Sequence, residues 1–190
     1  MKHIVIFASG SGTNCENIIR HFQSSATARV TLVVSNKAEA PVIDKARRLD
    51  VETAVVSKAD LGDPQVMLPL LQRHHAALLV LAGFLPIIPD YLIQAYSQRI
   101  VNLHPSLLPK YGGKGMWGRH VHEAVKAAGE QQTGMTVHWV TPVCDGGQII
   151  AQFSTALSPS DSVDDIAAKE HQLEMQHFPL VIEQLLTALD

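Results

Sequence analysis

Two side chains near the middle of the chain could together stabilise a negative charge and move a proton. Asn102 and His104 are two residues apart at the end of a predicted strand, Ile100–Leu103, and this spacing places both side chains on one face. An asparagine amide donates hydrogen bonds, and an imidazole exchanges protons near neutral pH. The pair therefore suits a reaction in which an oxyanion develops while a proton moves. The alternative is a polar strand end whose hydrogen bonds are satisfied by the following loop.

A carboxylate that could assist this pair lies 41 residues after His104. Asp145 is followed by two glycines, and Asp-Gly pairs are common in turns that have no other role. If the turn folds over the strand ends, Asp145 faces His104, and a nearby carboxylate favours the protonated imidazole. We therefore expect a direct or water-mediated hydrogen bond between Asp145 and His104.

A glycine-rich segment near the N-terminus is a candidate phosphate site. The segment Gly10–Asn14 follows a predicted strand and precedes residues with helical spacing. Glycine permits a tight turn, and the unpaired N–H groups of a helix N-terminus attract anions. This arrangement predicts that Gly12, Thr13 and Asn14 hold a phosphate. The alternative is a plain tight turn at the start of a helix.

A dinucleotide site is the rival interpretation of the same segment. A GxGxxG pattern requires a third glycine, but Cys15 occupies that position. The next predicted strand ends in Ser35-Asn36-Lys37, which has no acidic side chain to bind a ribose diol. Lys37 could pair with a 2′-phosphate, so a nicotinamide cofactor is disfavoured without being excluded.

Histidines elsewhere allow a metal site but do not predict one. His120 and His122 stand at the start of a predicted helix, where residues two apart do not face each other. His138 could complete three imidazoles, as in catalytic zinc sites, but no ligand spacing in the sequence requires it. We expect no metal.

Glu174 is a candidate for a partly buried carboxylate. It lies 11 residues after Val163, at nearly the same angle around a predicted helix, and so falls on the apolar side of that helix. A buried carboxylate needs a partner. If the helix has frayed before this residue, Glu174 is instead solvated.

Composition restricts the class of protein. The chain has 190 residues, of which 46% are hydrophobic and 17% charged, as is typical of a globular domain. A net charge of −3 and a pI near 6.3 do not favour a nucleic-acid partner, and no apolar run is long enough to span a membrane. Cys15 and Cys144 form no CxxC pair, and the N-terminal apolar stretch is too short for a signal peptide. We expect a cytoplasmic protein.

Apolar runs alternate with segments of helical spacing along the chain. The predicted strands are Ile4–Ala8, Val30–Val34, Thr53–Val56, Leu78–Ala82, Ile100–Leu103, Gly134–Thr141 and Gln148–Leu157. This order predicts one α/β domain over residues 1–190, with a mostly parallel, twisted, Rossmann-like sheet, helices on both faces and antiparallel strands in the C-terminal half. Pro179 is expected to divide the last helix in two.

The motifs together resemble the folate-dependent formyltransferases, and among them the phosphoribosylglycinamide formyltransferases. The resemblance is carried, in this order, by Ser9–Asn14, Ser35–Lys37, Leu81–Phe84, Asn102–Lys110, Gly134–His138 and Asp145–Gly147. It covers essentially the whole chain, and NxHPSLLPxY followed by DGG is highly specific for folate-dependent formyl transfer. It implies the formyltransferase fold and transfer of a formyl group from 10-formyltetrahydrofolate to the amine of glycinamide ribonucleotide, by a monomer or homodimer without a metal.

The resemblance also implies roles for individual residues. Asn102, His104 and Asp145 would form the catalytic group, and the ribonucleotide would be held by Gly12, Thr13, Asn14 and Glu174. The folate pocket would be lined by Leu85, Pro86, Ile87 and Ile88, and we expect it to be completed by Leu81, Ile93 and the backbone near Val140–Val143.

The sequence departs from the family in two places, and other functions remain as alternatives. The arginine that relatives carry in the Leu85–Pro86 stretch is absent, and Lys58 is the nearest candidate for the basic residue that follows their third strand. The loop Gly112–Gly118 is longer than in some relatives. The alternatives are hydrolysis of formyltetrahydrofolate, formylation of another small amine, and a non-catalytic nucleotide-binding module. The extra domains of relatives that act on methionyl-tRNA or hydrolyse formyltetrahydrofolate are not expected here.

Overall fold

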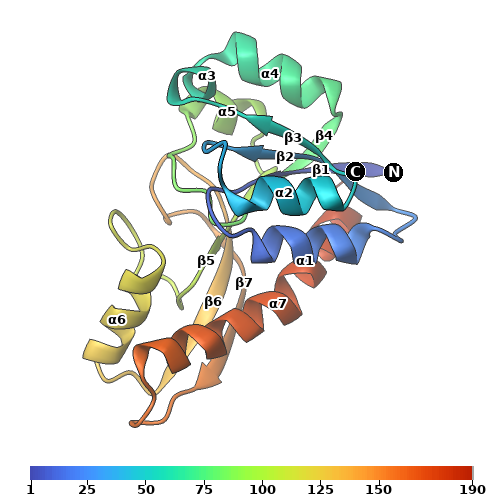
Figure 1. Ribbon diagram of the computed structural model, residues 1–190. Coiled ribbons are helices and arrows are strands. Elements are labelled where there is room, and N and C mark those ends of the chain that lie inside the picture. The colour runs from blue at the N-terminus through green and yellow to red at the C-terminus, as the bar shows by residue number, and fades with distance from the viewer. Residues whose placement is uncertain (190) are drawn as a thin grey trace.

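The computed structural model describes residues 1–189 and is built around a seven-stranded sheet with the strand order β3-β2-β1-β4-β5-β6-β7 (Figure 1). The strands are β1 (Lys2–Phe7), β2 (Ala28–Ser35), β3 (Glu52–Val55), β4 (Ala76–Leu81), β5 (Ile100–His104), β6 (Gln132–Trp139) and β7 (Ile149–Ala156). The first five strands pair in parallel, whereas β6 pairs antiparallel with both β5 and β7. The predicted fold class, mostly parallel with antiparallel C-terminal strands, is therefore confirmed.

Helices cover both faces of the sheet, as predicted (Figure 1). The helices are α1 (Thr13–Phe22), α2 (Pro41–Arg48), α3 (Lys58–Gly62), α4 (Pro64–Arg73), α5 (Asp90–Ala95), α6 (Arg119–Ala127) and α7 (Val163–Ala188). One core lies under α1, α2 and α7 and the other under α3, α4 and α5, while α6 packs against α7. Within residues 1–189, no helix combines the length and the apolar character that crossing a membrane requires.

The apolar run of β1 follows from this two-sided covering. Ile4 and Ile6 contribute to the core under α1, α2 and α7, whereas Val5 and Phe7 contribute to the opposite core. All four side chains are fully buried. A strand covered on both faces has no solvent side, so its sequence does not alternate between apolar and polar residues.

The last helix differs from the prediction. α7 continues without a break through Pro179, so the expectation that this proline divides the helix is wrong. Proline has no N–H to donate to the carbonyl four residues earlier, which belongs to Met175. The side-chain amide of Asn17 donates a hydrogen bond of 2.8 Å to that carbonyl instead. Because Pro179 is also buried in the core, packing and the substitute donor together hold the helix intact.

A short helix, α3, was not predicted. Ser57 precedes it and accepts a hydrogen bond from the main-chain N–H of Asp60, whose carboxylate accepts one from the N–H of Ser57. This reciprocal capping box is the sequence signal that could have indicated the helix.

Candidate active site

A cavity of about 920 Å³ opens at the carboxyl ends of β1, β4 and β5, where ligands bind in open α/β sheets. Its wall includes Gly10–Asn14 after β1, Leu81–Ile88 after β4 and Asn102–Pro105 at the end of β5. The loop Gly113–Gly118, the turn between β6 and β7, and one side of α7 complete it. The cavity thus brings together the residues expected for catalysis and for the ribonucleotide, and of those expected for the folate it includes Leu81, Leu85–Ile88 and Val140.

Both ring nitrogens of His104 lie near oxygen atoms. Nε2 lies 2.7 Å from the main-chain carbonyl of Tyr111, and because a carbonyl only accepts hydrogen bonds, Nε2 carries a hydrogen. Nδ1 lies 3.5 Å from Oδ2 of Asp145, so the expected proximity of these two residues is confirmed. A proton taken up at Nδ1 therefore stands beside a carboxylate. The imidazole side chain is only 4% exposed, so water screens this attraction little.

Asp145 is held as a carboxylate in the turn between β6 and β7. Its Oδ2 accepts a hydrogen bond of 2.8 Å from the main-chain N–H of Gly113, and its Oδ1 lies 3.6 Å from Nε2 of His138. Burial opposes ionisation, but the hydrogen bond from the main-chain N–H of Gly113 and the electrostatic attraction of His104 lower the pKa of Asp145 below its usual value. The site therefore carries a negative charge at neutral pH.

The amide of Asn102 is oriented by His138, for which the histidine pattern suggested only a possible metal ligand. Antiparallel pairing of β5 with β6 places the two residues opposite each other. Nδ1 of His138 lies 2.9 Å from the carbonyl of Trp139 and so carries the hydrogen, which leaves Nε2 to accept from Nδ2 of Asn102 at 3.1 Å. The amide keeps a second N–H for a ligand. The pairing of β5 with β6, which the sequence did not specify, is the signal that would have identified His138.

The glycine-rich turn depends on Gly12, which caps α1 in the left-handed conformation, with φ 71° and ψ 28°. A Cβ at this position would lie 2.6 Å from Cβ and 2.9 Å from Cα of Val42 on α2, so only glycine allows this close packing. No side chain caps α1, and its first N–H groups, including those of Thr13 and Asn14, are available to an anion. This geometry suits a phosphate.

Glu174 joins α7 to the glycine-rich turn. Its Oε2 accepts a hydrogen bond of 2.8 Å from Nδ2 of Asn14 and lies 2.8 Å from Nδ1 of His171. The hydrogen bond with Glu174 raises the pKa of His171 although partial burial opposes the shift. The expectation of a partly buried carboxylate with a partner is confirmed, and the alternative of a frayed helix is wrong.

Another part of the cavity wall is apolar. It is lined by Leu85, Pro86, Ile87, Ile88 and Val140, together with Leu81. Ile87 is 83% exposed and Leu85 is 50% exposed, so the mouth presents apolar side chains without a partner. The expectation for Ile93 is wrong, because this residue packs against the core under α4 and α5 instead.

Neither of the two lysines that the sequence suggested for contacts with an anionic group lies in the cavity. Lys37 and Lys58 are exposed outside the cavity, and among the described residues that line it, Lys114 is the only lysine or arginine. His122 is buried in the cavity wall, whereas the side chain of His120 is 61% exposed, so they do not form a pair. Within residues 1–189 no group of three or more His, Cys, Asp or Glu side chains is placed to hold a metal ion.

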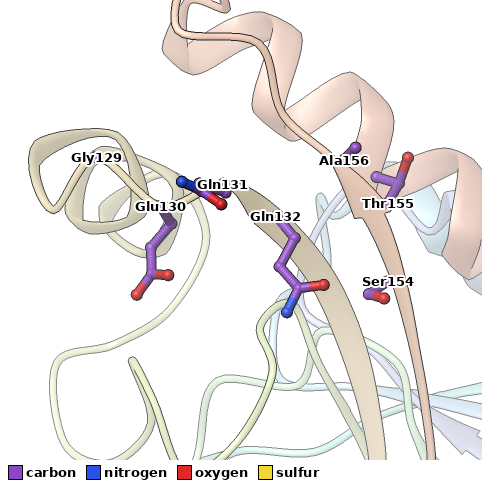
Figure 2. Close-up of a pocket in the computed structure, with 7 residues that line it drawn as sticks. All are labelled: Gly129, Glu130, Gln131, Gln132, Ser154, Thr155 and Ala156. Carbon is purple, nitrogen blue, oxygen red and sulfur yellow. The ribbon is translucent and has the colours of Figure 1, made fainter.

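A second, smaller hollow of about 560 Å³ lies between the end of α6 and the edge strand β7 (Figure 2). It is lined by residues 129–132 and 154–156 and contains none of the expected site residues. Oε1 of Glu130 accepts hydrogen bonds of 2.8 Å from the Tyr111 hydroxyl and from Nζ of Lys110, and Tyr111 contacts His104 through its main-chain carbonyl. We therefore place the active site in the larger cavity.

The fold and the cavity together define a class of protein. The chain belongs to the Formyl transferase family, whose sequence profile matches residues 2–182. Curated relatives include a phosphoribosylglycinamide formyltransferase of Haemophilus influenzae, which is 34% identical over 96% of this chain and 86% of the relative. A phosphoribosylglycinamide formyltransferase of Bacillus subtilis is 35% identical over 98% of this chain and 95% of the relative.

Solved structures agree with this membership. The phosphoribosylglycinamide formyltransferase of Anaplasma phagocytophilum superposes with a TM-score of 0.89 at 28% identity, over 98% of this chain and 88% of the other. Glycinamide ribonucleotide transformylase 1 of Geobacillus kaustophilus superposes with a TM-score of 0.86 at 32% identity, over 100% of both chains. The family resemblance that the motifs indicated is confirmed.

Proposed function

We propose that the protein transfers the formyl group of 10-formyltetrahydrofolate to the amine of glycinamide ribonucleotide, a reaction of purine biosynthesis. One observation carries the proposal: Asn102, His104 and Asp145 meet in a cavity that has an anion-binding turn on one side and an apolar wall on the other. An enzyme that transfers a group from a folate to a phosphorylated amine needs both an anion-binding region and an apolar region in its active site. The curated relatives bear the name of this activity.

The catalytic group suits attack of the amine on the formyl carbon. The tetrahedral intermediate carries a negatively charged oxygen, to which Asn102 can donate its second N–H and protonated His104 its Nδ1–H. Asp145 stabilises the imidazolium in a site where water screens charges little. The proton of the attacking nitrogen then passes, through His104 or a water molecule, to the departing folate nitrogen. Holding both substrates together contributes further to the rate.

The two substrates would occupy opposite ends of the cavity. The phosphate of the ribonucleotide would bind the N–H groups of Gly12, Thr13 and Asn14, next to Glu174. The folate ring would lie on Leu85, Pro86, Ile87, Ile88 and Val140. In place of the arginine that relatives carry, Lys114 supplies a positive charge to an anionic group of either substrate.

Two other functions fit less well. A hydrolase of formyltetrahydrofolate needs no phosphate site, so the turn at Gly12 and the Asn14–Glu174 pair favour a phosphorylated amine over water. A non-catalytic nucleotide-binding module has no use for a buried carboxylate beside a buried imidazole, since neither contributes to binding a nucleotide phosphate.

The proposal also covers metal dependence, oligomeric state and location. No step of the mechanism requires a metal, because the donors on Asn102 and His104 already stabilise the oxyanion. We propose a monomer or homodimer without nucleic-acid or membrane partners. A cytoplasmic location fits the free, exposed thiol of Cys144.

The decisive experiment is a formyl-transfer assay with purified protein and 10-formyltetrahydrofolate. We expect formylated product with glycinamide ribonucleotide, little formate release with water alone, and slow reaction with glycinamide that lacks the ribose phosphate. Equal formate release with and without the ribonucleotide would instead identify a hydrolase. Absence of any folate turnover would support the binding module.

A further inference from the structure

One short segment of the chain, residues 110–113, contacts both His104 and Asp145. The main-chain carbonyl of Tyr111 accepts a hydrogen bond of 2.7 Å from Nε2 of His104. The main-chain N–H of Gly113 donates one of 2.8 Å to Oδ2 of Asp145, the oxygen that faces Nδ1 of His104. The segment therefore determines both which nitrogen of the imidazole keeps its hydrogen and where the carboxylate stands.

Tyr111 has a backbone conformation that needs support from its surroundings. Its φ of 54° is in the left-handed region, which residues other than glycine rarely occupy, and which persists only where the fold holds it. The hydroxyl donates a hydrogen bond of 2.8 Å to Oε1 of Glu130. The ring packs between α6 and α7, against Val121, Val125 and Ile166. The contacts of this side chain therefore hold the carbonyl that faces the imidazole.

Glu130 is a rigidly placed acceptor for that hydroxyl. Its main-chain N–H donates to the carbonyl of Val125 in the last turn of α6. Gly129, with φ 64°, donates to the carbonyl of Lys126, and the two bonds together form a Schellman ending of the helix. Hydrogen bonds from Lys110 and from the tyrosine hydroxyl lower the pKa of Glu130, so the side chain is a carboxylate at neutral pH. The end of α6 thus fixes the position of the acceptor.

The side chains of Tyr111 and Glu130 both lie outside the larger cavity. Glu130 instead borders the smaller hollow (Figure 2). An effect of either side chain on the reaction must therefore pass through the main chain of residues 110–113. The start of this segment is held separately, because the buried hydroxyl of Ser106 donates a hydrogen bond of 2.7 Å to the carbonyl of Lys110. The bond between Tyr111 and Glu130 is thus the contact that holds the next residue.

We propose that Tyr111 and Glu130 are positioning residues for formyl transfer. Through residues 110–113, they set the orientation of His104 and Asp145. This inference rests on the proposed function and deepens it. Catalytic groups must be held to within a fraction of an ångström, and a displacement of about 1 Å can lower a rate about 100-fold. The bond between the tyrosine hydroxyl and Glu130 therefore contributes to kcat and not to the binding of either substrate.

Removing the tyrosine hydroxyl tests this hydrogen bond by itself. Tyr111→Phe keeps the packed ring and should lower kcat about 5- to 30-fold, with the KM for each substrate within about 2-fold of wild type. Tyr91→Phe is the matched control, because the Tyr91 hydroxyl donates a hydrogen bond of 2.7 Å to the Leu61 carbonyl outside the cavity. This control should change neither constant. An unchanged kcat in Tyr111→Phe, a higher KM with kcat unchanged, or an equal loss in the control would overturn the proposal.

Two substitutions of Glu130 test the other partner of the bond. Glu130→Gln keeps an oxygen that accepts from the hydroxyl, so kcat should stay within about 3-fold of wild type. Glu130→Ala removes the acceptor and should lower kcat about as much as Tyr111→Phe does. In the double variant the two losses should not add, because both substitutions remove the same bond. Additive losses, or a glutamine variant as slow as the alanine variant, would contradict the proposal. Should Glu130→Ala fail to fold, Tyr111→Phe and Glu130→Gln give the decision.

The Nε2 proton of His104 gives a readout that does not depend on formyl transfer. In protein with ¹⁵N-labelled histidine, this proton should exchange slowly with water, because the side chain is buried and the Tyr111 carbonyl accepts the hydrogen bond. In Tyr111→Phe the proton should exchange at least about 5-fold faster, whereas Glu130→Gln should match wild type. If wild type transfers no formyl group, the proposed function fails while this measurement still tests the positioning. Equal exchange rates in wild type and Tyr111→Phe would refute the assignment.

Discussion

His104 and Tyr111 are joined by a hydrogen bond of 2.7 Å between Nε2 of the imidazole and the main-chain carbonyl. This bond leaves Nδ1, 3.5 Å from Asp145, as the nitrogen that takes up a proton in the proposed mechanism. Tyr111 has a left-handed backbone with φ 54°, and its hydroxyl donates to Glu130, which borders the smaller hollow in Figure 2. The orientation of the His104 imidazole therefore depends on Tyr111, which is itself held by Glu130 at the edge of the smaller hollow.

Replacing Asp145 by Asn should lower kcat about 10²- to 10³-fold while KM changes only a few-fold, because the amide keeps the shape but removes the charge beside His104. In wild type, the lowered pKa of Asp145 keeps the carboxylate charged as pH falls through the usual aspartate range. The deficit of the variant should shrink as pH falls and the imidazole protonates unaided, until protonation of the substrate amine interferes. Steady-state kinetics between pH 6 and 8.5 measures this, with the exposed Asp164→Asn as control. An unchanged rate would rule out the three-residue mechanism.

Replacing Asn17 by Ala should destabilise the fold by about 1 kcal/mol, because the Met175 carbonyl loses the donor that replaces the missing N–H of Pro179. In a Pro179→Ala background, the alanine supplies the missing helical N–H to the same carbonyl, and the effect of Asn17→Ala should largely disappear. Urea unfolding of wild type, the two single variants and the double variant gives the coupling free energy between the two substitutions. Strict additivity would show that Asn17 does not compensate for the proline.

Replacing Gly12 by Ala should destabilise the fold by about 2 kcal/mol or more, because the left-handed conformation is strained for alanine and the new Cβ overlaps Val42. Gly10→Ala is the matched stability control, since a Cβ there meets nothing within 4 Å. Thermal unfolding compares the two proteins. A second substitution, Val42→Ala, should recover part of the loss by removing the overlapping methyl groups, whereas no recovery would mean that the loss comes from backbone strain and from the overlap with Cβ and Cα of residue 42, which alanine keeps.

Replacing Glu170 by Gln should stabilise the protein increasingly as pH rises above about 4.5. Because burial and the neighbouring charge of Glu174 raise the pKa of Glu170 in the folded protein, this side chain ionises above about pH 4.5 only in the unfolded chain. The wild-type protein therefore loses stability relative to the Glu170→Gln variant as pH rises toward the folded-state pKa. Below the unfolded-state pKa both states are protonated and the difference should be smallest. We expect the thermal midpoint of the variant to gain a few degrees on wild type between pH 5 and pH 8, at about 1.4 kcal/mol per pH unit as an upper limit. If the difference in thermal midpoint between the two proteins stays constant across this range, Glu170 is ionised in the folded protein as well.

Local patterns in the sequence determined the elements and part of the site. The two-residue spacing of Asn102 and His104 places both on one side of β5, and the glycines before α1 predict an anion-binding turn. The alternation of strands and helices predicted a mostly parallel sheet, because each pattern reflects the repeat of a single element and its burial. These properties depend on neighbours in the chain, so the sequence alone shows them.

Only the tertiary structure decided which distant groups meet. Asn14 and Glu174 are 160 residues apart, and their hydrogen bond depends on the packing of α7 against α1. The role of His138 depends on the register of β6 against β5, since a shift by one residue would turn its side chain to the opposite face. Pro179 was misjudged because the donor that replaces its N–H lies on another helix. Local periodicity predicts which face of an element is buried, whereas the partner on that face is fixed by the packing of the whole chain.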